Sequence, residues 1–251
     1  METTALLAAC AAVVLGAGLQ RVAGMGLGLV AAPVLTVLLG ASVGVLVSNV
    51  AAIVTALLIL RAVRDRVDWR RVATVLPLML VGSVLGAVTV READAGWLDV
   101  IVGGSVLAAL AASAVLRRQV RITGRPVAVA TGLAAGFMNT TSGVAAPAWT
   151  AYARATRWDH RSFAATLQPL LVVMNTMSVV TKLSFGAIPS GSVPEWWAWP
   201  VLLVAVLTGV ALGAGLARRI PTRFAAGIAL ALAVAGAITA LSRGLLTVTP
   251  L

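Results

Sequence analysis

Residues whose side chains could bind or transfer something gather at two polar interruptions of an otherwise apolar chain. The first interruption places Gln20 and Arg21 just before Gly24 and Gly26. The second is a run of amide and hydroxyl residues: Asn139, Thr140, Thr141 and Ser142. A guanidinium, two amides and three hydroxyls can hold an anion through charge and hydrogen bonds, and no carboxylate stands among them to carry protons.

The elements that must position these residues are long apolar helices. The chain has 251 residues, of which 60% are hydrophobic and 11% charged, and its mean hydropathy is +1.02. The apolar residues fall in runs of about 18 to 21, the helix length that crosses the hydrocarbon core of a membrane. The short alternating segments of a transmembrane barrel are absent. This composition excludes a water-soluble enzyme and predicts an all-α, polytopic membrane protein.

Six apolar runs are predicted to cross the membrane as single helices: residues 43–60, 72–90, 97–116, 163–181, 197–217 and 224–241. Two further segments, residues 5–39 and 126–152, contain the polar interruptions. Backbone that leaves the helix at membrane depth must be buried in protein or line a wet cavity, because lipid cannot satisfy its polar groups. The two broken segments are therefore predicted to hold the binding site.

The chain also contains an internal repeat. The sequence Val-Ala-Ala-Pro of residues 30–33 recurs at 144–147. A second match pairs Asp68, Trp69, Gly82 and Gly86 with Glu195, Trp196, Gly209 and Gly213, and we expect the glycine pairs to be helix-packing faces. We predict two tandem repeats, residues 1–119 and 120–251, each with one broken helix and three spanning helices. Interrupted helices at corresponding positions of two repeats are typical of secondary transporters.

The basic residues indicate how the repeats are oriented. The net charge of +11 comes from residues between apolar runs, so membrane topology explains it better than nucleic-acid binding does. If all eight segments cross fully, the basic residues divide between both sides. If each broken segment is a re-entrant hairpin, most of them lie on one side. We favour the hairpins, which make the repeats inverted and place both termini outside.

Charge within the predicted membrane region is confined to one arginine. All eight acids lie in predicted loops or at the ends of spans: Glu2, Asp65, Asp68, Glu92, Asp94, Asp99, Asp159 and Glu195. Proton pumps and most cation transporters, which need a carboxylate at mid-membrane, are therefore disfavoured. Arg21 lies at apparent membrane depth with no acid nearby in sequence, which favours an anionic partner. The alternative is that Arg21 snorkels or binds backbone carbonyls.

The remaining polar residues complete a predicted anion site. Residues 139–142 and the glycines at 24–28 precede resumed helices, whose first N–H groups favour negative charge. Alternatively, the glycines serve packing and the hydroxyls bind their own helices. Asn49 with Ser48, and Gln168 with Asn175, could be ligands or interhelical hydrogen bonds. The predicted substrate-binding residues are Gln20, Arg21, Gly24, Gly26, Asn49, Asn139, Thr140, Thr141, Ser142 and Asn175.

No pattern of catalytic residues occurs in the sequence. His160 is the sole histidine and has no neighbouring nucleophile, and Cys10 is the sole cysteine, which excludes a disulfide framework and a thiolate metal site. Phosphate loops and metal-ligand clusters are missing as well. We predict that the protein is not an enzyme and needs no cofactor or metal.

Residues 18–33, which contain Gln20, alternating glycines and Pro33, resemble the first-repeat pattern of the sulfite exporter TauE/SafE family, also called the toluene sulfonate uptake permease family. Met25 stands where an aromatic residue is common, and the second copy carries residues 139–142 in place of alternating glycines. The resemblance implies movement of a small sulfur-containing oxyanion, such as sulfite, a sulfonate or sulfoacetate, across the cytoplasmic membrane.

From the residues and the resemblance together, we expect an exporter that holds its anion between Arg21 and the two hairpin tips and alternates access by rocking its repeats. The alternatives are an anion channel of the formate or nitrite type, a transporter of another organic anion, and a non-transporting scaffold. The expected partners are the small anion and the lipid bilayer of a multi-pass protein in the cytoplasmic membrane. No nucleic acid is expected, and a homo-oligomer stays open.

Overall fold

A computed structural model describes residues 3–115, 124–188, 193–217 and 222–248 of the chain. Within these residues the chain forms α-helices, one 3-10 turn (Arg64–Arg66) and no strand. The helices are α1 (Thr3–Ala23), α2 (Leu27–Leu39), α3 (Ala41–Val63), α4 (Trp69–Glu92), α5 (Ala95–Val115), α6 (Arg125–Ser142), α7 (Ala146–Ala155), α8 (His160–Ser184), α9 (Ala198–Leu216) and α10 (Thr222–Val248). The all-helical fold predicted from the sequence is confirmed.

Five helices in the described part of the chain are long and apolar enough to cross a membrane: α1, α3, α4, α8 and α9. Four of them cover predicted spans, although Trp197 and Ala217 flank α9 rather than lie in it. The predicted span 97–116 falls on α5 except for residue 116, which is outside the described residues, and the span 224–241 falls on α10. Both broken segments are interrupted as predicted, at Gly24–Gly26 and at Gly143–Ala145.

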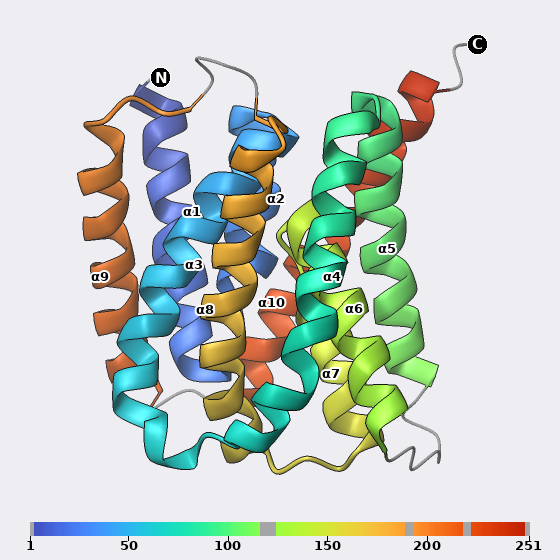
Figure 1. Cartoon of the computed structure of the whole chain (residues 1–251). Helices are drawn as coiled ribbons and strands as arrows, with labels where there is room; N and C mark the ends of the chain where they lie inside the picture. Colours follow the sequence, from blue (N-terminus) through green and yellow to red (C-terminus); the bar gives the residue numbers. More distant parts are fainter. Residues whose placement is uncertain (1–2, 116–123, 189–192, 218–221, 249–251) are drawn as a thin grey trace.

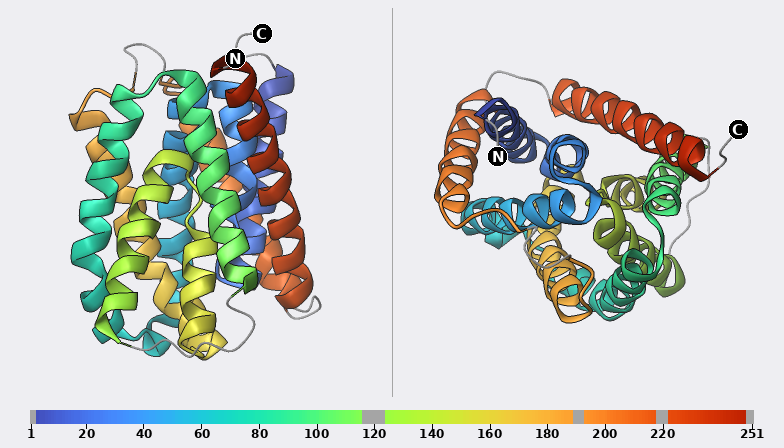
Figure 2. Two further views of the ribbon diagram at one scale, coloured as in Figure 1. Left: turned by 90° about the vertical axis from the view of Figure 1, so that its right-hand side faces the viewer. Right: turned by 90° about the horizontal axis from the view of Figure 1, so that it is seen from above.

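Each broken segment folds as a helical hairpin, and the two hairpins enter the bundle from opposite ends (Figure 1). α1 descends from the end where the chain begins and α2 returns toward it, whereas α6 rises from the other end and α7 returns there (Figures 1 and 2). Thr3, where α1 begins, and Val248, where α10 ends, lie at the same end of the bundle. We name this end the terminal end and the other the loop end.

The two hairpins are not built from four half-length helices of equal size. α1 is long enough to cross a membrane by itself, whereas α2 has 13 residues and α7 has 10. The first break therefore lies close to the loop end, where a Cβ added at Gly24 would come within 2.6 Å of Cβ of Ala164 in the second turn of α8. The reason is that Gln20 and Arg21 do not interrupt α1, which ends only at Gly24 with its left-handed φ.

Glycines hold the hairpins against the spanning helices. On α4 and α6, a side chain at Gly82 would collide with the Leu133 carbonyl and one at Gly136 with the Met79 carbonyl. On α1 and α9, a Cβ at Gly213 would lie 2.6 Å from the Gly18 carbonyl oxygen. Both predicted glycine pairs, at 82 and 86 and at 209 and 213, thus face the first helix of a hairpin, and the prediction that they are packing faces is confirmed.

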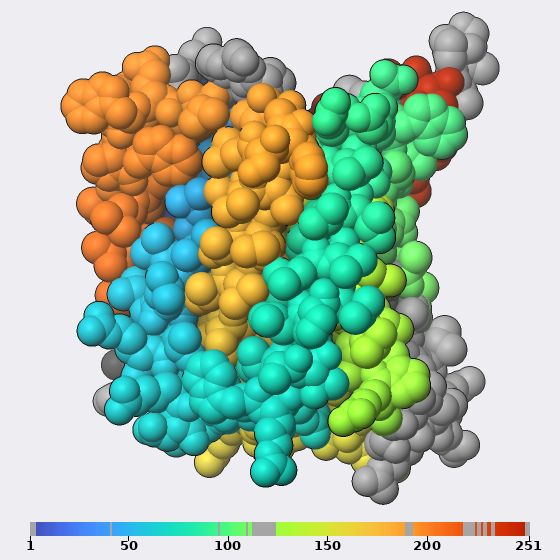
Figure 3. All heavy atoms as spheres, in the orientation of Figure 1, coloured from blue at the N-terminus to red at the C-terminus, as the bar shows by residue number. Residues whose placement is uncertain are grey.

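α8 lies at the centre of the site that follows. It fills the space between α3 and α4, as the space-filling view shows (Figure 3). Its N-terminus is capped by Asp159, whose Oδ2 accepts a hydrogen bond from the Ser162 N–H at 3.0 Å. Buried residues occur along most of its length, which is unusual for a helix at the rim of a membrane bundle and places it in the interior.

Candidate functional site

One face of α8 carries a stripe of polar side chains through the interior of the bundle. Gln168, Asn175, Ser178 and Lys182 follow one another at intervals of three, four or seven residues, which places them on the same side of a helix. Each is at most 2% exposed. Buried polar groups at this density need partners from neighbouring helices. Gln168 and Asn175 find theirs at the two breaks, and Ser178 finds its partner on α3.

Gln168 holds the break of the first hairpin. Its Nε2 donates to the Gly24 carbonyl at 3.0 Å, and its Oε1 accepts a hydrogen bond from Gln20 Nε2 at 3.4 Å. Gly24 has a φ of +82°, a left-handed conformation that glycine adopts at little cost and that ends α1. The Gly24 N–H donates to the Gln20 carbonyl at 2.8 Å and closes the last turn.

Asn175 holds the break of the second hairpin in a similar way. Its Oδ1 accepts a hydrogen bond from Asn139 Nδ2 at 3.0 Å, and its own Nδ2 donates to the Leu171 carbonyl at 2.7 Å. Gly143, with a φ of +72°, ends α6, and its N–H donates to the Asn139 carbonyl at 2.9 Å. One turn further along α8, Ser178 Oγ accepts a hydrogen bond from Asn49 Nδ2 at 2.6 Å.

These bonds make Gln20 and Asn139 structural counterparts. The backbone carbonyl of each accepts a hydrogen bond from the N–H of a glycine with a left-handed φ. The side-chain amide of each donates a hydrogen bond to a side chain of α8. The repeated Val-Ala-Ala-Pro sequence does not share this register, because Pro33 lies inside α2 whereas Pro147 lies in the first turn of α7. The sequence repeat thus locates both broken segments but misaligns their polar residues.

A small cavity of about 30 Å³ lies between the two breaks. Its lining includes half of the predicted substrate-binding residues: Gln20, Gly26, Asn49, Asn139 and Asn175. The cavity is also lined by Gly28, Ser48, Val144, Trp149 and Leu171, among others. A volume of this size holds about one water molecule, so a larger ligand requires the breaks to move apart.

Two donors at the cavity have no hydrogen-bond partner in the described part of the chain. They are Ser48 Oγ and Trp149 Nε1, and both residues are 1% exposed. Buried donors without a partner are uncommon in folded proteins, and each is free to bond a water or another small molecule. Both can donate to an oxyanion, which accepts several hydrogen bonds at once.

The N-termini of both short helices also border the cavity. α2 begins after Gly26 and α7 after Ala145, and neither N-cap residue provides a side-chain capping bond. The first N–H groups of a helix carry partial positive charge and favour a bound anion. The breaks themselves touch, since a Cβ at Gly28 would collide with the Gly143 carbonyl oxygen.

The other half of the predicted residues does not line this cavity. Arg21 is half-buried on α1, and its Cβ would lie 2.9 Å from a Cβ added at Gly213 of α9. Thr140 points toward Gly86 of α4, where its Cβ would meet an added Cβ at 2.9 Å. The Gly24 carbonyl accepts a hydrogen bond from Gln168.

The hydroxyls of the second break mostly bind their own helix. Thr141 Oγ1 donates to the Phe137 carbonyl at 3.0 Å, and Ser142 Oγ donates to the Met138 carbonyl at 2.6 Å. This back-bonding is the alternative considered for hydroxyls in helices. It arises because residues 139–142 form the last turn of α6, whose carbonyls are within reach, rather than the approach to the N-terminus of α7.

Three residues of this interior were left out of the predicted site. Gln168 is open in the sequence between a ligand and an interhelical hydrogen bond, Trp149 is the one tryptophan inside a broken segment, and Lys182 follows the predicted span 163–181. α8 extends to Ser184, which brings Lys182 inside the bundle. The regular spacing of Gln168, Asn175 and Lys182 on one helix face could have identified the stripe.

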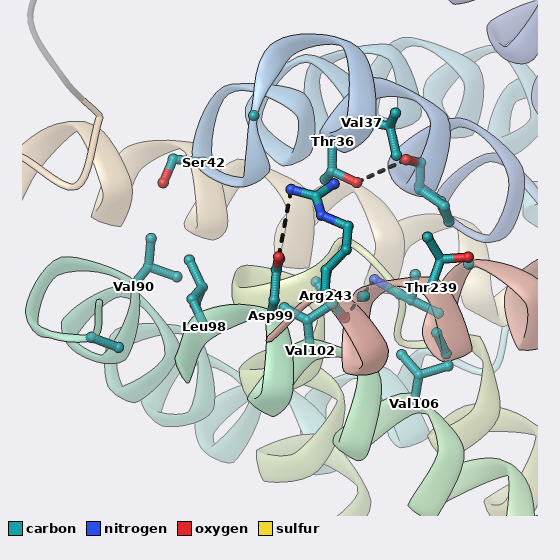
Figure 4. A pocket seen from close by; sticks show the side chains of 18 residues that line it. Thr36, Val37, Ser42, Val90, Leu98, Asp99, Val102, Val106, Thr239 and Arg243 are labelled. Carbon is teal, nitrogen blue, oxygen red and sulfur yellow. Dashed lines mark hydrogen bonds and ion pairs between the residues drawn. The ribbon is translucent and has the colours of Figure 1, made fainter. Parts of the chain in front are cut away.

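A larger cavity of about 350 Å³ lies near the terminal end (Figure 4). α2, α5 and α10 contribute most of its wall, including Thr36, Val102 and Thr239. Arg243 Nη2 and Asp99 Oδ2 form an ion pair of 3.6 Å across it. The cavity also reaches Ser142 and Val144 at the second break. Val144 lines both cavities, so the two lie next to each other at the second break.

Apolar span-length helices, two broken helices and a buried polar cavity between them are typical of polytopic membrane transporters. The model of the sulfite exporter TauE/SafE family matches residues 8–241, nearly the whole chain, and the protein belongs to this family. Comparison with curated proteins and with solved structures gave no match. The resemblance noted in residues 18–33 is thereby confirmed over the length of the chain.

Proposed function

We propose that this protein is a secondary transporter that exports a small sulfur-containing oxyanion across the cytoplasmic membrane, with the anion bound between the two breaks. The observation that carries the proposal is the cavity bordered by Gln20, Asn139, two uncapped helix N-termini and the unpartnered donors of Ser48 and Trp149. Every one of these groups can donate a hydrogen bond, and no carboxylate lines the cavity. Membership of the family supports a sulfite-like substrate.

The halves of the chain, residues 1–119 and 120–251, act in this proposal as inverted repeats. Hairpins that enter from opposite ends support it (Figure 1). So does the reciprocal packing, in which α6 of the second half packs on α4 of the first, and α1 of the first half packs on α9 of the second. Each repeat thus supplies one wall of the site, and movement of one against the other would open the cavity alternately to either side.

The two ends of the bundle differ in a way that supports alternating access. At the terminal end, the larger cavity leads to Val144, beside the central cavity. At the loop end, Trp158 packs edge-on to Tyr152 and Phe163 at centroid distances of 5.8 and 5.4 Å, and the Arg71 guanidinium lies 4.2 Å from the Trp158 ring centre. In our proposal these aromatic contacts close the loop end while the terminal end is accessible.

Charge supports an orientation with the loop end in the cytoplasm. Most of the described arginines at helix ends are there: Arg61, Arg64, Arg66, Arg70, Arg71, Arg125, Arg154, Arg157 and Arg161. Basic residues are retained on the cytoplasmic side of membrane proteins. Independently of the orientation, an inside-negative potential favours anion export by about 2.3 kcal/mol per charge per 100 mV.

Counterflow distinguishes a carrier from a channel. Proteoliposomes loaded with unlabelled sulfite should accumulate labelled sulfite transiently, because a carrier exchanges bound sulfite across the membrane. The initial rate should saturate with sulfite concentration, because each carrier has one binding site. A rate that stays linear in sulfite concentration without counterflow would assign an anion channel instead. If sulfite gives no flux but sulfoacetate or toluenesulfonate does, the transporter stands and the substrate is the larger anion.

A further inference from the structure

Lys182 is the one lysine of the chain and is completely buried. The side chain lies in the last two turns of α8 with 0% exposure, and its Nζ has no hydrogen-bond partner in the described part of the chain. No carboxylate of the described residues lies within 4.0 Å of Nζ to form an ion pair. The ion pairs of the described residues involve arginines, as between Arg243 and Asp99.

A structural role does not account for this arrangement. A lysine near the end of a spanning helix ordinarily extends its amine to the membrane surface, which the complete burial of Lys182 rules out here. A buried ammonium without a counter-charge is costly, and an apolar residue of the same size would pack at this position without that cost. A cationic group retained in such a place indicates that an anion visits it.

The position of Lys182 connects it to the proposed site. It lies one turn beyond Ser178, which binds Asn49, and two turns beyond Asn175, which binds Asn139. These residues share one face of α8, so the stripe runs from the first break, past the central cavity, to the buried amine. α8 ends at the terminal end of the bundle (Figure 1), and Lys182 is not among the residues that line the central or the larger cavity.

We propose that Lys182 binds the transported oxyanion directly, as the positive charge at the outer end of the polar stripe on α8. The inference rests on the proposed function and adds to it the group that neutralises the substrate. The amide and N–H donors between the breaks contribute hydrogen bonds without net charge, and the ammonium of Lys182 supplies the charge. An oxyanion that moves along the stripe between the breaks and the terminal end would meet this charge on its way.

The test compares Lys182→Met with wild type in two measurements. Thermal unfolding of the purified protein without anion should be unchanged or shifted upward in Lys182→Met, because an unpaired buried charge has been removed. Sulfite binding, measured by the stabilisation that sulfite adds, should weaken by about 10- to 100-fold. Lys182→Arg keeps the charge and should keep most of the binding. A stable apo protein that binds poorly is the signature of a ligand group rather than of a structural one.

Arg91→Met is the matched control. Arg91 is also at the terminal end, on α4, but it is exposed and pairs with Glu92 at 3.2 Å, so its loss should leave sulfite binding unchanged. Equal sulfite binding by wild type and Lys182→Met would overturn the inference and leave the transport function standing. An apo Lys182→Met protein that is less stable than wild type, or does not fold, would assign a structural role and overturn it too. Wild type that binds and moves none of sulfite, sulfoacetate and toluenesulfonate would overturn both.

Discussion

Gln20 and Asn139 come from different halves of the chain and meet α8 in equivalent ways. Each ends a helix at a left-handed glycine, and each donates its amide to an α8 side chain, Gln20 to Gln168 and Asn139 to Asn175. α8 therefore joins the two breaks to each other. A displacement of either hairpin must stretch or exchange one of these bonds, which gives the breaks a means of moving in concert.

The break of the second hairpin should tolerate no side chain. Gly143→Ala combines a left-handed φ of +72° with a Cβ that would lie 2.8 Å from Cβ of Ala32. Gly186 has a similar φ of +65°, but an added Cβ would meet nothing within 4 Å. Gly186→Ala therefore measures the free-energy cost of the left-handed backbone alone. We expect Gly186→Ala to cost about 1 to 2 kcal/mol and Gly143→Ala about 1 kcal/mol or more beyond that. Unfolding midpoints of the purified variants measure the difference, and equal midpoints would refute the close approach.

Packing of the second hairpin on α4 should depend on Gly136. A leucine there would collide with the Met79 carbonyl, and we expect Gly136→Leu to lose about 2 to 3 kcal/mol of stability. Gly104 of α5 has nothing within 4 Å of an added Cβ, so Gly104→Leu should stay within about 0.5 kcal/mol of wild type. Thermal unfolding compares them. A larger loss in the Gly104 variant would contradict the α4 and α6 contact.

An acid placed at the central cavity should repel the substrate. Asn175→Asp keeps the shape of the side chain and the acceptor for Asn139 but adds a negative charge beside the cavity. We expect the KM for sulfite to rise about tenfold or more. Ser184→Asp adds the same charge to an exposed position of α8, where solvent screens it, and should leave the KM within about twofold. Initial rates over a range of sulfite concentrations give both constants, and an unchanged KM in Asn175→Asp would place the anion elsewhere.

Thiol accessibility should report the orientation of the hairpins. In a Cys10→Ser background, a cysteine at Arg157 of the loop end should react only with reagents that enter the cytoplasm. Trp196→Cys, at a position 82% exposed and near the terminal end, should react from outside. Labelling of intact cells with an impermeant reagent distinguishes the positions. Reaction of the cysteine at position 157 from outside, with the one at position 196 protected, would restore eight simple crossings and contradict the inverted arrangement.

Much of the fold could be predicted because apolar length and polar interruption have direct physical meaning in a membrane. Runs that later form α3, α4 and α8 stand out by hydropathy, and the breaks follow from glycines at 24 and 143. The lengths of the hairpin helices could not be predicted, since nothing in residues 5–39 indicates that α1 continues unbroken to Ala23.

Half of the predicted site residues line the central cavity, and the positions of the others have a common cause. Residues that bind across helices, such as Asn139 and Asn49, were found because an amide in an apolar span needs a partner. Thr141 and Ser142 were included because their side chains are polar, but a hydroxyl in a last helical turn can satisfy itself locally. Arg21 and Lys182 show that only tertiary packing determines which cation is buried: Arg21 is half-buried and Lys182 is fully buried.

The most direct measurement is sulfite flux into proteoliposomes at a clamped potential, for wild type, Asn139→Ala and Thr131→Ala. Asn139 lines the central cavity, whereas Thr131, on the same helix, only donates to the Val127 carbonyl. We predict saturable, potential-sensitive flux in wild type and Thr131→Ala, and a loss of about tenfold or more in Asn139→Ala. Flux in Asn139→Ala equal to that of wild type would contradict an anion site between the two breaks.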